Sequence, residues 1–231
     1  MKKYCVIGGG GGLSNKYIKN YLPTAPDVNY KFYDLLGSPE NPFIGDVSLE
    51  LLLNELEDFI ISSEITNIIA HSFGCFLILT LLCNNKIKPT KIILLNPMPL
   101  SYSIWTKSIE RLVEVIPKDV IIKAERYNKL GDGVNEFAEY FPYYTANKIS
   151  CPIEVEYNAQ VCNELNSQIQ EYDYTEIVMK NLDIIKLVQC KEDCFLYNYI
   201  FDKNHFCIDN VGHFPFIEDI NQFKGLFKKI I

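Results

Sequence analysis

The sequence lacks any apolar run longer than one buried strand or helix requires, so we expect no segment to cross a membrane. The short apolar run Tyr4–Ile7, which precedes a block of glycines, is too short for the apolar core of a signal peptide. The sequence also lacks a cluster of basic residues, and its formal net charge is −7 at pH 7. Nucleic acid and anionic membrane surfaces are therefore not expected partners.

The eight cysteines lack the spacing of a metal site. There is no C-x-x-C pair, Cys190 and Cys194 are separated by three residues, and the chain has only three histidines to complete a ligand set. We therefore expect no metal. Without a secretory signal the thiols are expected to stay reduced, as in the cytoplasm, and most of them to act as small buried hydrophobic residues.

Strand-like and helical segments alternate over residues 1–97 and resume after residue 180, which is the pattern of a parallel sheet with crossover helices. Such crossovers place helices on both faces of the sheet and leave the carboxyl ends of the strands to carry the site. The expected strands are Lys3–Ile7, Tyr30–Leu36, Asn67–His71, Lys91–Leu95, Ile184–Gln189 and His205–Ile208, and the expected helices are Leu13–Leu22, Ser48–Ser63, Phe73–Asn84 and Ile220–Ile230.

The alternation stops over residues 98–180. This stretch contains helical patterns at Ser108–Val115 and Val134–Tyr140 and a short strand-like run at residues 153–157. We interpret it as a cap inserted between two parts of one sheet domain, residues 1–97 and 181–231. Its aromatic side chains either pack the cap on the sheet or line a pocket for an apolar acyl or aromatic substrate; they are Tyr102, Trp105, Tyr140, Phe141, Tyr143 and Tyr144.

A serine stands where one strand pattern runs directly into a helical pattern, in the segment Asn67–Cys75. On such a tight turn the Ser72 hydroxyl projects above the sheet, and the N–H of Phe73 can face a developing oxyanion. Small residues are needed two positions to either side, and Ala70 and Gly74 stand there. The alternative is that Ser72 is an ordinary helix N-cap.

A serine nucleophile needs a base, and the chain offers three histidines. His71 directly precedes Ser72 on the strand, where neighbouring side chains point to opposite faces. His205 begins a strand candidate, at the wrong end for a site at the carboxyl ends. His213 follows a strand and a glycine, so it is the expected base.

Five consecutive glycines, Gly8–Gly12, follow the first strand candidate. A dinucleotide loop would have the pattern G-x-G-x-x-G and an acid about 20 residues further on. Every register lacks the third glycine, and Asp34 is the one convincing strand-end acid. Nucleotide binding is therefore the weaker interpretation of this run.

Taken together, these segments resemble the α/β-hydrolase family. The stretch A-H-S-F-G resembles its nucleophile elbow, and Gly212–Glu218 resembles the G-H-F-P-x-x-E stretch that carries the catalytic histidine, here His213. Leu187–Asp193 resembles the strand and G-x-x-D turn that supplies the acid, with Cys190 in the glycine place and Asp193 as the acid. Other acids that could substitute for it are Asp183, Glu192 and Asp209.

The resemblance implies a three-layer α/β-hydrolase fold, with a mostly parallel sheet, helices on both faces and an inserted cap. It also implies that the first glycines form the loop that supplies the second oxyanion donor, from Gly9 or Gly10. The expected activity is that of a serine hydrolase of carboxylic esters or thioesters. Its expected catalytic residues are Ser72, His213 and Asp193, and its oxyanion donors Phe73 and Gly9 or Gly10.

Pocket residues expected beside this machinery are His71, Trp105 and Tyr102. No cofactor is needed, and the expected partner is a small-molecule acyl substrate, free or bound to a carrier or to coenzyme A. Two alternatives stay open: a C–C bond hydrolase or lyase in the same pocket, and a binding protein without catalysis on this scaffold. The sequence indicates no oligomeric state.

Overall fold

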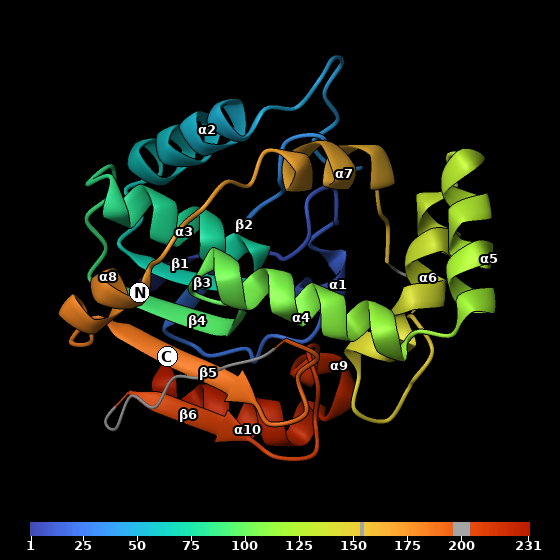
Figure 1. Cartoon of the computed structure of the whole chain (residues 1–231). Helices are drawn as coiled ribbons and strands as arrows, with labels where there is room; N and C mark the ends of the chain where they lie inside the picture. The colour runs from blue at the N-terminus through green and yellow to red at the C-terminus, as the bar shows by residue number, and fades with distance from the viewer. Residues whose placement is uncertain (153–154, 196–203) are drawn as a thin grey trace.

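The computed structural model describes residues 1–152, 155–195 and 204–231. Within these residues six parallel strands form one sheet in the order β2-β1-β3-β4-β5-β6 (Figure 1). They are β1 (Lys2–Ile7), β2 (Val28–Tyr33), β3 (Asn67–Ser72), β4 (Lys91–Pro97), β5 (Ile185–Cys190) and β6 (His205–Ile208). The parallel sheet expected from the sequence is confirmed.

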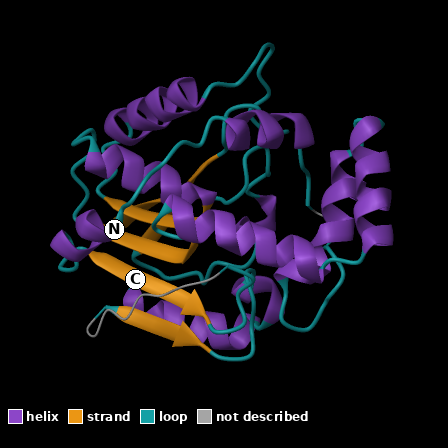
Figure 2. Cartoon of the chain, viewed as in Figure 1, coloured by secondary structure: helices purple, strands orange, loops and turns teal. Residues whose placement is uncertain are grey.

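Helices cover both faces of the sheet, which gives three layers (Figure 2). Alternate residues of β1 show the division, because Cys5 and Ile7 belong to one buried cluster and Tyr4 and Val6 to the other. The first face carries α2 (Leu49–Ser62), α3 (Phe73–Cys83) and α8 (Thr175–Lys180). The second carries α1 (Lys16–Lys19), α9 (Pro215–Glu218) and α10 (Ile220–Ile230).

Local sequence explains the two long helices of the first face. Ser48 caps α2 by accepting a hydrogen bond from the N–H of Leu51 at 3.0 Å, and Leu52, Leu56 and Ile60 form its buried side. Helix α3 is apolar around its whole circumference and is buried almost throughout. Helix α3 therefore packs between the sheet and the outer helices, and this packing holds its first residue, Phe73, in place.

Residues 102–180 contribute five helices within the described part of the chain: α4 (Tyr102–Val115), α5 (Lys118–Lys129), α6 (Gly133–Tyr144), α7 (Ala159–Ser167) and α8. Helices α5 and α6 lie beyond the carboxyl ends of the strands, and α4 leads to them from β4 (Figure 1). The division of the chain into a core and a cap stays a prediction, since α8 also packs on the sheet.

Several expected elements differ from the structure in their bounds. The helical patterns at Ser108–Val115 and Val134–Tyr140 are parts of the longer helices α4 and α6. The helix expected over Leu13–Leu22 shrinks to α1. Its first residues pair with another segment instead, because Leu13 forms an antiparallel bridge with Tyr157 and the N–H of Ser14 donates to the Glu156 carbonyl at 3.0 Å. The strand expected to reach Leu36 ends at Tyr33, because the chain turns at Gly37, where φ is 82°.

Residues 153 and 154 of the expected run 153–157 lie outside the described residues. Tyr157 forms an isolated bridge with Leu13. Across the described ranges, no helix combines the length and the apolar character needed to span a membrane.

Candidate active site

Ser72 is the last residue of β3 and stands directly before α3. Its backbone is strained, with φ 52° and ψ −117°, values that a non-glycine residue rarely adopts. It occupies the N-cap position of α3, yet its side chain makes no capping hydrogen bond. At Gly74 a Cβ atom would lie 2.5 Å from the carbonyl oxygen of Gly8, so the turn can pack on the glycine loop only with glycine there.

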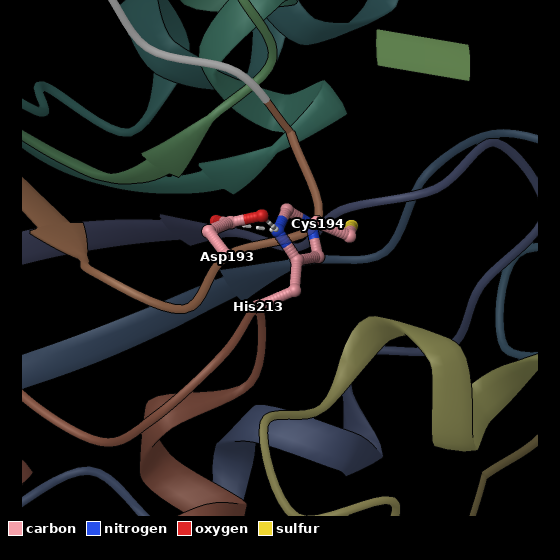
Figure 3. A group of neighbouring side chains, drawn as sticks. All are labelled: Asp193, Cys194 and His213. Atoms are coloured by element: carbon pink, nitrogen blue, oxygen red, sulfur yellow. Dashed lines mark hydrogen bonds and ion pairs between the residues drawn. The ribbon is translucent and has the colours of Figure 1, made fainter. Parts of the chain in front are cut away.

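The Ser72 hydroxyl bonds to His213 instead. Its Oγ lies 2.8 Å from Nε2 of His213, and Nδ1 of the same ring lies 2.9 Å from Oδ2 of Asp193. The Asp193 carboxylate points at the ring (Figure 3). The side chains of His213 and Asp193 are 3% and 1% exposed, and Ser72 is 8% exposed. The structure thus brings together the three residues expected from the sequence, in a largely buried site.

Asp193 is the acid that meets the histidine. It lies in the turn after β5, where its carboxylate also accepts the N–H of Phe195 at 3.0 Å and the thiol of Cys194. A buried carboxylate with several donors is well compensated. Asp209, one of the alternatives, is exposed and pairs with Lys191 at 2.7 Å.

Asp193, Cys194 and His213 are also close enough for a shared metal ion, since one ligand atom from each lies within 4.8 Å of the others (Figure 3). The donor set does not fit a metal well. Both ring nitrogens of His213 have hydrogen-bond partners, Asp193 and Ser72. Burial and the Asp193 carboxylate raise the pKa of the Cys194 thiol well above its usual value, which disfavours the thiolate that binds metals.

The backbone of His213 is fixed from three sides. Its N–H donates to the Tyr144 carbonyl at 2.8 Å. Its carbonyl accepts from Nε2 of His71 at 2.9 Å and from Nδ2 of Asn96 at 3.1 Å. Both lone pairs of that carbonyl are therefore used. These bonds fix the backbone that carries the His213 ring.

His71 is 1% exposed, and both of its ring nitrogens contact other protein groups. Its Nδ1 lies 2.8 Å from the Tyr17 hydroxyl, and its Nε2 lies against the His213 carbonyl. Burial and the neighbouring His213 hold the pKa of His71 well below 6.5, so the ring is neutral.

The glycine loop lies beside Ser72. A Cβ atom on Gly9 would come 2.5 Å from Cβ of Ser72, so the close approach requires glycine there. The Gly9 N–H donates to the Tyr17 hydroxyl at 2.5 Å. Gly10 has φ 76°, and its N–H has no hydrogen-bond partner among the described residues. Of the two glycines expected to supply an oxyanion donor, Gly10 is thus the one whose N–H can still bind a ligand. The other expected donor is the N–H of Phe73 at the start of α3.

A cavity of about 250 Å³ opens onto Ser72 and His213. Trp105 and His71 line it, as expected, whereas Tyr102 is not among its described lining residues. Tyr102 packs on Trp105 and Tyr172 instead, with ring centroids 5.6 and 6.2 Å away. Other aromatic lining residues are Phe73, Phe137, Tyr140, Tyr144, Tyr157, Phe195 and Phe214.

Three supporting residues were not singled out from the sequence: Tyr17, Asn96 and Glu218. Glu218 accepts the N–H groups of Gly212, Ala146 and Phe214 at 3.0, 2.8 and 3.3 Å, so it holds the loop that carries His213. Its place at the end of the G-H-F-P-x-x-E stretch was the available signal. The sequence gives no such signal for Tyr17 and Asn96, because His71 lies 54 positions from Tyr17 and Gly212 lies 116 positions from Asn96.

Comparison with known proteins gives structural matches alone: no family model and no curated protein matches the sequence. MenH from S. aureus superposes with a TM-score of 0.68 at 14% identity, covering 99% of this chain and 92% of that one. An alpha/beta fold family hydrolase from Bacillus anthracis gives 0.66 at 15%, covering 100% and 92%. A lipase-esterase related protein from Clostridium acetobutylicum gives 0.60 at 15%, covering 100% and 94%. Together with the parallel sheet and its flanking helices, these similarities show that the chain has the α/β-hydrolase fold.

Proposed function

We propose that this protein is a serine hydrolase that cleaves a carboxylic ester or thioester through an acyl-enzyme on Ser72. One observation carries the proposal: the hydrogen-bonded series from Ser72 Oγ to His213 to Asp193, at 2.8 and 2.9 Å. A serine hydroxyl becomes a nucleophile when a positioned imidazole can take its proton and a carboxylate fixes the tautomer of that imidazole.

In the first half-reaction Oγ of Ser72 forms a bond to the acyl carbon while His213 Nε2 takes the hydroxyl proton. The carbonyl oxygen becomes an oxyanion, held by the N–H groups of Phe73 and Gly10. The bond to the alcohol or thiol then breaks, and His213 returns the proton to the leaving group. Asp193 stabilises the transient imidazolium from the Nδ1 side.

In the second half-reaction a water molecule attacks the acyl carbon. His213 takes one water proton and then gives it to Ser72 Oγ as the ester bond to the enzyme breaks. The products are a carboxylic acid and the free serine. The aromatic lining of the cavity supports an organic acyl substrate, free or attached to a carrier or to coenzyme A.

The test is turnover of short- and medium-chain nitrophenyl esters and acyl thioesters, together with labelling by a fluorophosphonate. Ser72→Ala is expected to lose both activity and label, with kcat lower by at least about 10⁴-fold. Ser101→Ala is the matched control: Ser101 is equally buried, at 8% exposure, and is likewise the N-cap of a helix without a capping bond. It should retain activity and label.

Two outcomes would contradict the proposal. Turnover that survives in Ser72→Ala excludes the acyl-enzyme. Wild-type protein that neither turns over nor labels would favour the alternatives, a lyase reaction without a serine adduct or a binding protein on this scaffold.

A further inference from the structure

One carboxylate, that of Glu136, lies in the wall of the cavity that opens onto Ser72 and His213. It comes from α6 and is half-buried. Among the described lining residues it is the one aspartate, glutamate, lysine or arginine. A formal charge at this place matters because the other described lining residues include many aromatic side chains and no second aspartate or glutamate and no lysine or arginine.

The protein does not neutralise this carboxylate within the described residues. Its hydrogen bond comes from Nδ2 of Asn128, a neutral donor 2.8 Å from Oε2, and no lysine or arginine nitrogen of the described chain lies within 4.0 Å. Glu139 on the same helix differs, because Lys123 pairs with it at 2.7 Å. Burial raises the pKa of Glu136, as expected for a partly desolvated acid without a cation beside it.

The negative field of Glu136 extends along the cavity wall. Burial is the main reason that the pKa values of Tyr157 and Cys162 are raised, and the Glu136 charge adds to both shifts. Both residues line the cavity. The carboxylate is therefore electrostatically coupled to the space that a ligand would fill.

The aromatic lining favours a positively charged ligand, as the Glu136 carboxylate does. Faces of tryptophan and tyrosine rings attract cations, most strongly where water is excluded. Trp105, Tyr140 and Tyr157 supply such rings in the same cavity. A neutral apolar acyl group would bury Glu136 further without compensating its charge, which is unfavourable.

We propose that this cavity selects ligands with an organic ammonium group, and that Glu136 is their counter-ion among the aromatic rings. The substrate class is then an ester or thioester whose acyl or leaving group carries an amine or a quaternary ammonium. The turnover of such a substrate rests on the proposed function, whereas the binding selectivity does not.

Binding is tested with two probes of nearly the same shape, choline and 3,3-dimethylbutan-1-ol, which differ in carrying a charged nitrogen or a neutral carbon. Trp105, the single tryptophan of the chain, lines the cavity and reports occupancy by its fluorescence. The intact wild type is compared with E136Q, which keeps the size and the acceptor oxygen of the side chain. E139Q makes the same change on the same helix outside the cavity.

The wild type is expected to bind choline roughly tenfold more tightly than the neutral alcohol, a typical effect of one partly buried ion pair with cation–π contacts. E136Q should reduce this ratio to near unity, and E139Q should keep it. Equal affinities in the wild type, a ratio unchanged in E136Q, or no binding of either probe by fluorescence and calorimetry would overturn the proposal.

Turnover separates this proposal from the proposed function. Butyrylthiocholine and 3,3-dimethylbutyl thiobutyrate are compared by kcat/KM, and the ratio of the two values cancels any general loss of activity in E136Q. Choline selectivity without turnover or fluorophosphonate labelling would contradict the hydrolase and leave the ammonium site standing. Turnover of both thioesters with a ratio near unity in every variant would contradict the ammonium site alone.

Discussion

The hydroxyl of Tyr17 in α1 lies 2.8 Å from Nδ1 of His71 in β3, and this contact is the middle link between the glycine loop and the loop that carries His213. Tyr17 accepts the N–H of Gly9, so its own proton is donated to Nδ1. The neutral His71 ring then carries its proton on Nε2 and donates it to the carbonyl of His213. A continuous chain of hydrogen bonds therefore runs from the glycine loop to the histidine loop beneath the candidate nucleophile.

The first prediction concerns Tyr17→Phe, which removes one oxygen and leaves the Gly9 N–H and His71 Nδ1 without a partner. An unsatisfied buried polar group costs about 1–3 kcal/mol. Because two groups lose their partner, we expect the free energy of unfolding to fall by at least that amount. We expect kcat to fall about tenfold, because the glycine loop loses the hydrogen bond that holds Gly9. KM should change less, since Tyr17 is not among the described cavity-lining residues.

Urea unfolding and ester kinetics measure both effects of Tyr17→Phe. Tyr33→Phe is the control, because it also removes a tyrosine hydroxyl bond, to Glu55 at 3.0 Å, away from the cavity. It should reduce stability and leave kcat near the wild-type value. Equal kcat in the two variants would show that Tyr17 has no positioning role.

The second prediction concerns the pH dependence of stability. Folding holds the pKa of His71 well below 6.5, mainly through burial and then through His213. As pH falls below 6.5, the unfolded state binds a proton at this residue that the folded state does not, so stability is lost down to the folded pKa. The loss reaches about 1.4 kcal/mol per pH unit for one group.

His71→Gln removes this titration. The variant should be less stable than the wild type at pH 7.5, and the difference in the free energy of unfolding should narrow as the pH falls from 6.5 to 5. Urea unfolding at several pH values measures it. A difference that stays constant over this range would contradict a neutral, buried His71. His205→Gln is the control, because His205 is only partly buried and its pKa is lowered less than that of His71.

The sheet, Ser72 and His213 could be predicted because they depend on local patterns. Continuous apolar runs mark β3 and β4. Ser72 is the last residue of β3 and His213 follows β6, and the carboxyl ends of parallel strands meet at one edge of the sheet. The acid stayed open among several residues, since the choice depends on how the turn after β5 folds back. The Asp193 N–H donates to the Cys190 carbonyl at 3.3 Å in that turn.

Other parts depend on contacts that leave no local signal. Helix α5 buries only Ala124 and exposes Ile122, so its apolar pattern is weak, and α8 has just six residues. Asn96 bonds to Gly212, 116 positions away in the sequence. Asparagine is common near strand ends and in loops. No sequence pattern marks Asn96 as the residue that bonds to the loop carrying His213.

The third prediction concerns Asn96→Asp. Asn96 is fully buried: its Nδ2 donates to the carbonyls of Gly212 and His213 at 3.0 and 3.1 Å, and its Oδ1 accepts the Cys190 N–H at 2.8 Å. A carboxylate of the same shape has no donor for the two carbonyl oxygens and brings a buried charge against them. We expect a stability loss of at least about 3 kcal/mol, measured by urea unfolding.

Asn96→Asp should also lower kcat, because the carbonyl of His213 loses one of its two donors. Asn67→Asp is the control, since Asn67 donates to the Lys3 carbonyl at 3.0 Å in an exposed setting at the other end of β3. It should cost well under 1 kcal/mol. A similar small cost in Asn96→Asp would show that the bonds of Asn96 do not hold the histidine loop.

The last prediction compares two glycine-to-alanine changes. At Gly9 the added methyl would lie 2.5 Å from Cβ of Ser72 and 3.1 Å from the His71 carbonyl oxygen, so backbone must move on one side of the contact. At Gly225, within α10, it meets nothing within 4 Å. Gly225→Ala should stabilise the fold by up to about 1 kcal/mol, because alanine favours the helix, and leave kcat unchanged.

Gly9→Ala should reduce kcat at least tenfold even where the chain still folds, because the displaced loop carries the Gly10 N–H away from the oxyanion. Fluorophosphonate labelling rates of the two folded variants measure the difference, and equal rates would mean that the close approach of Gly9 to Ser72 does not position the donor.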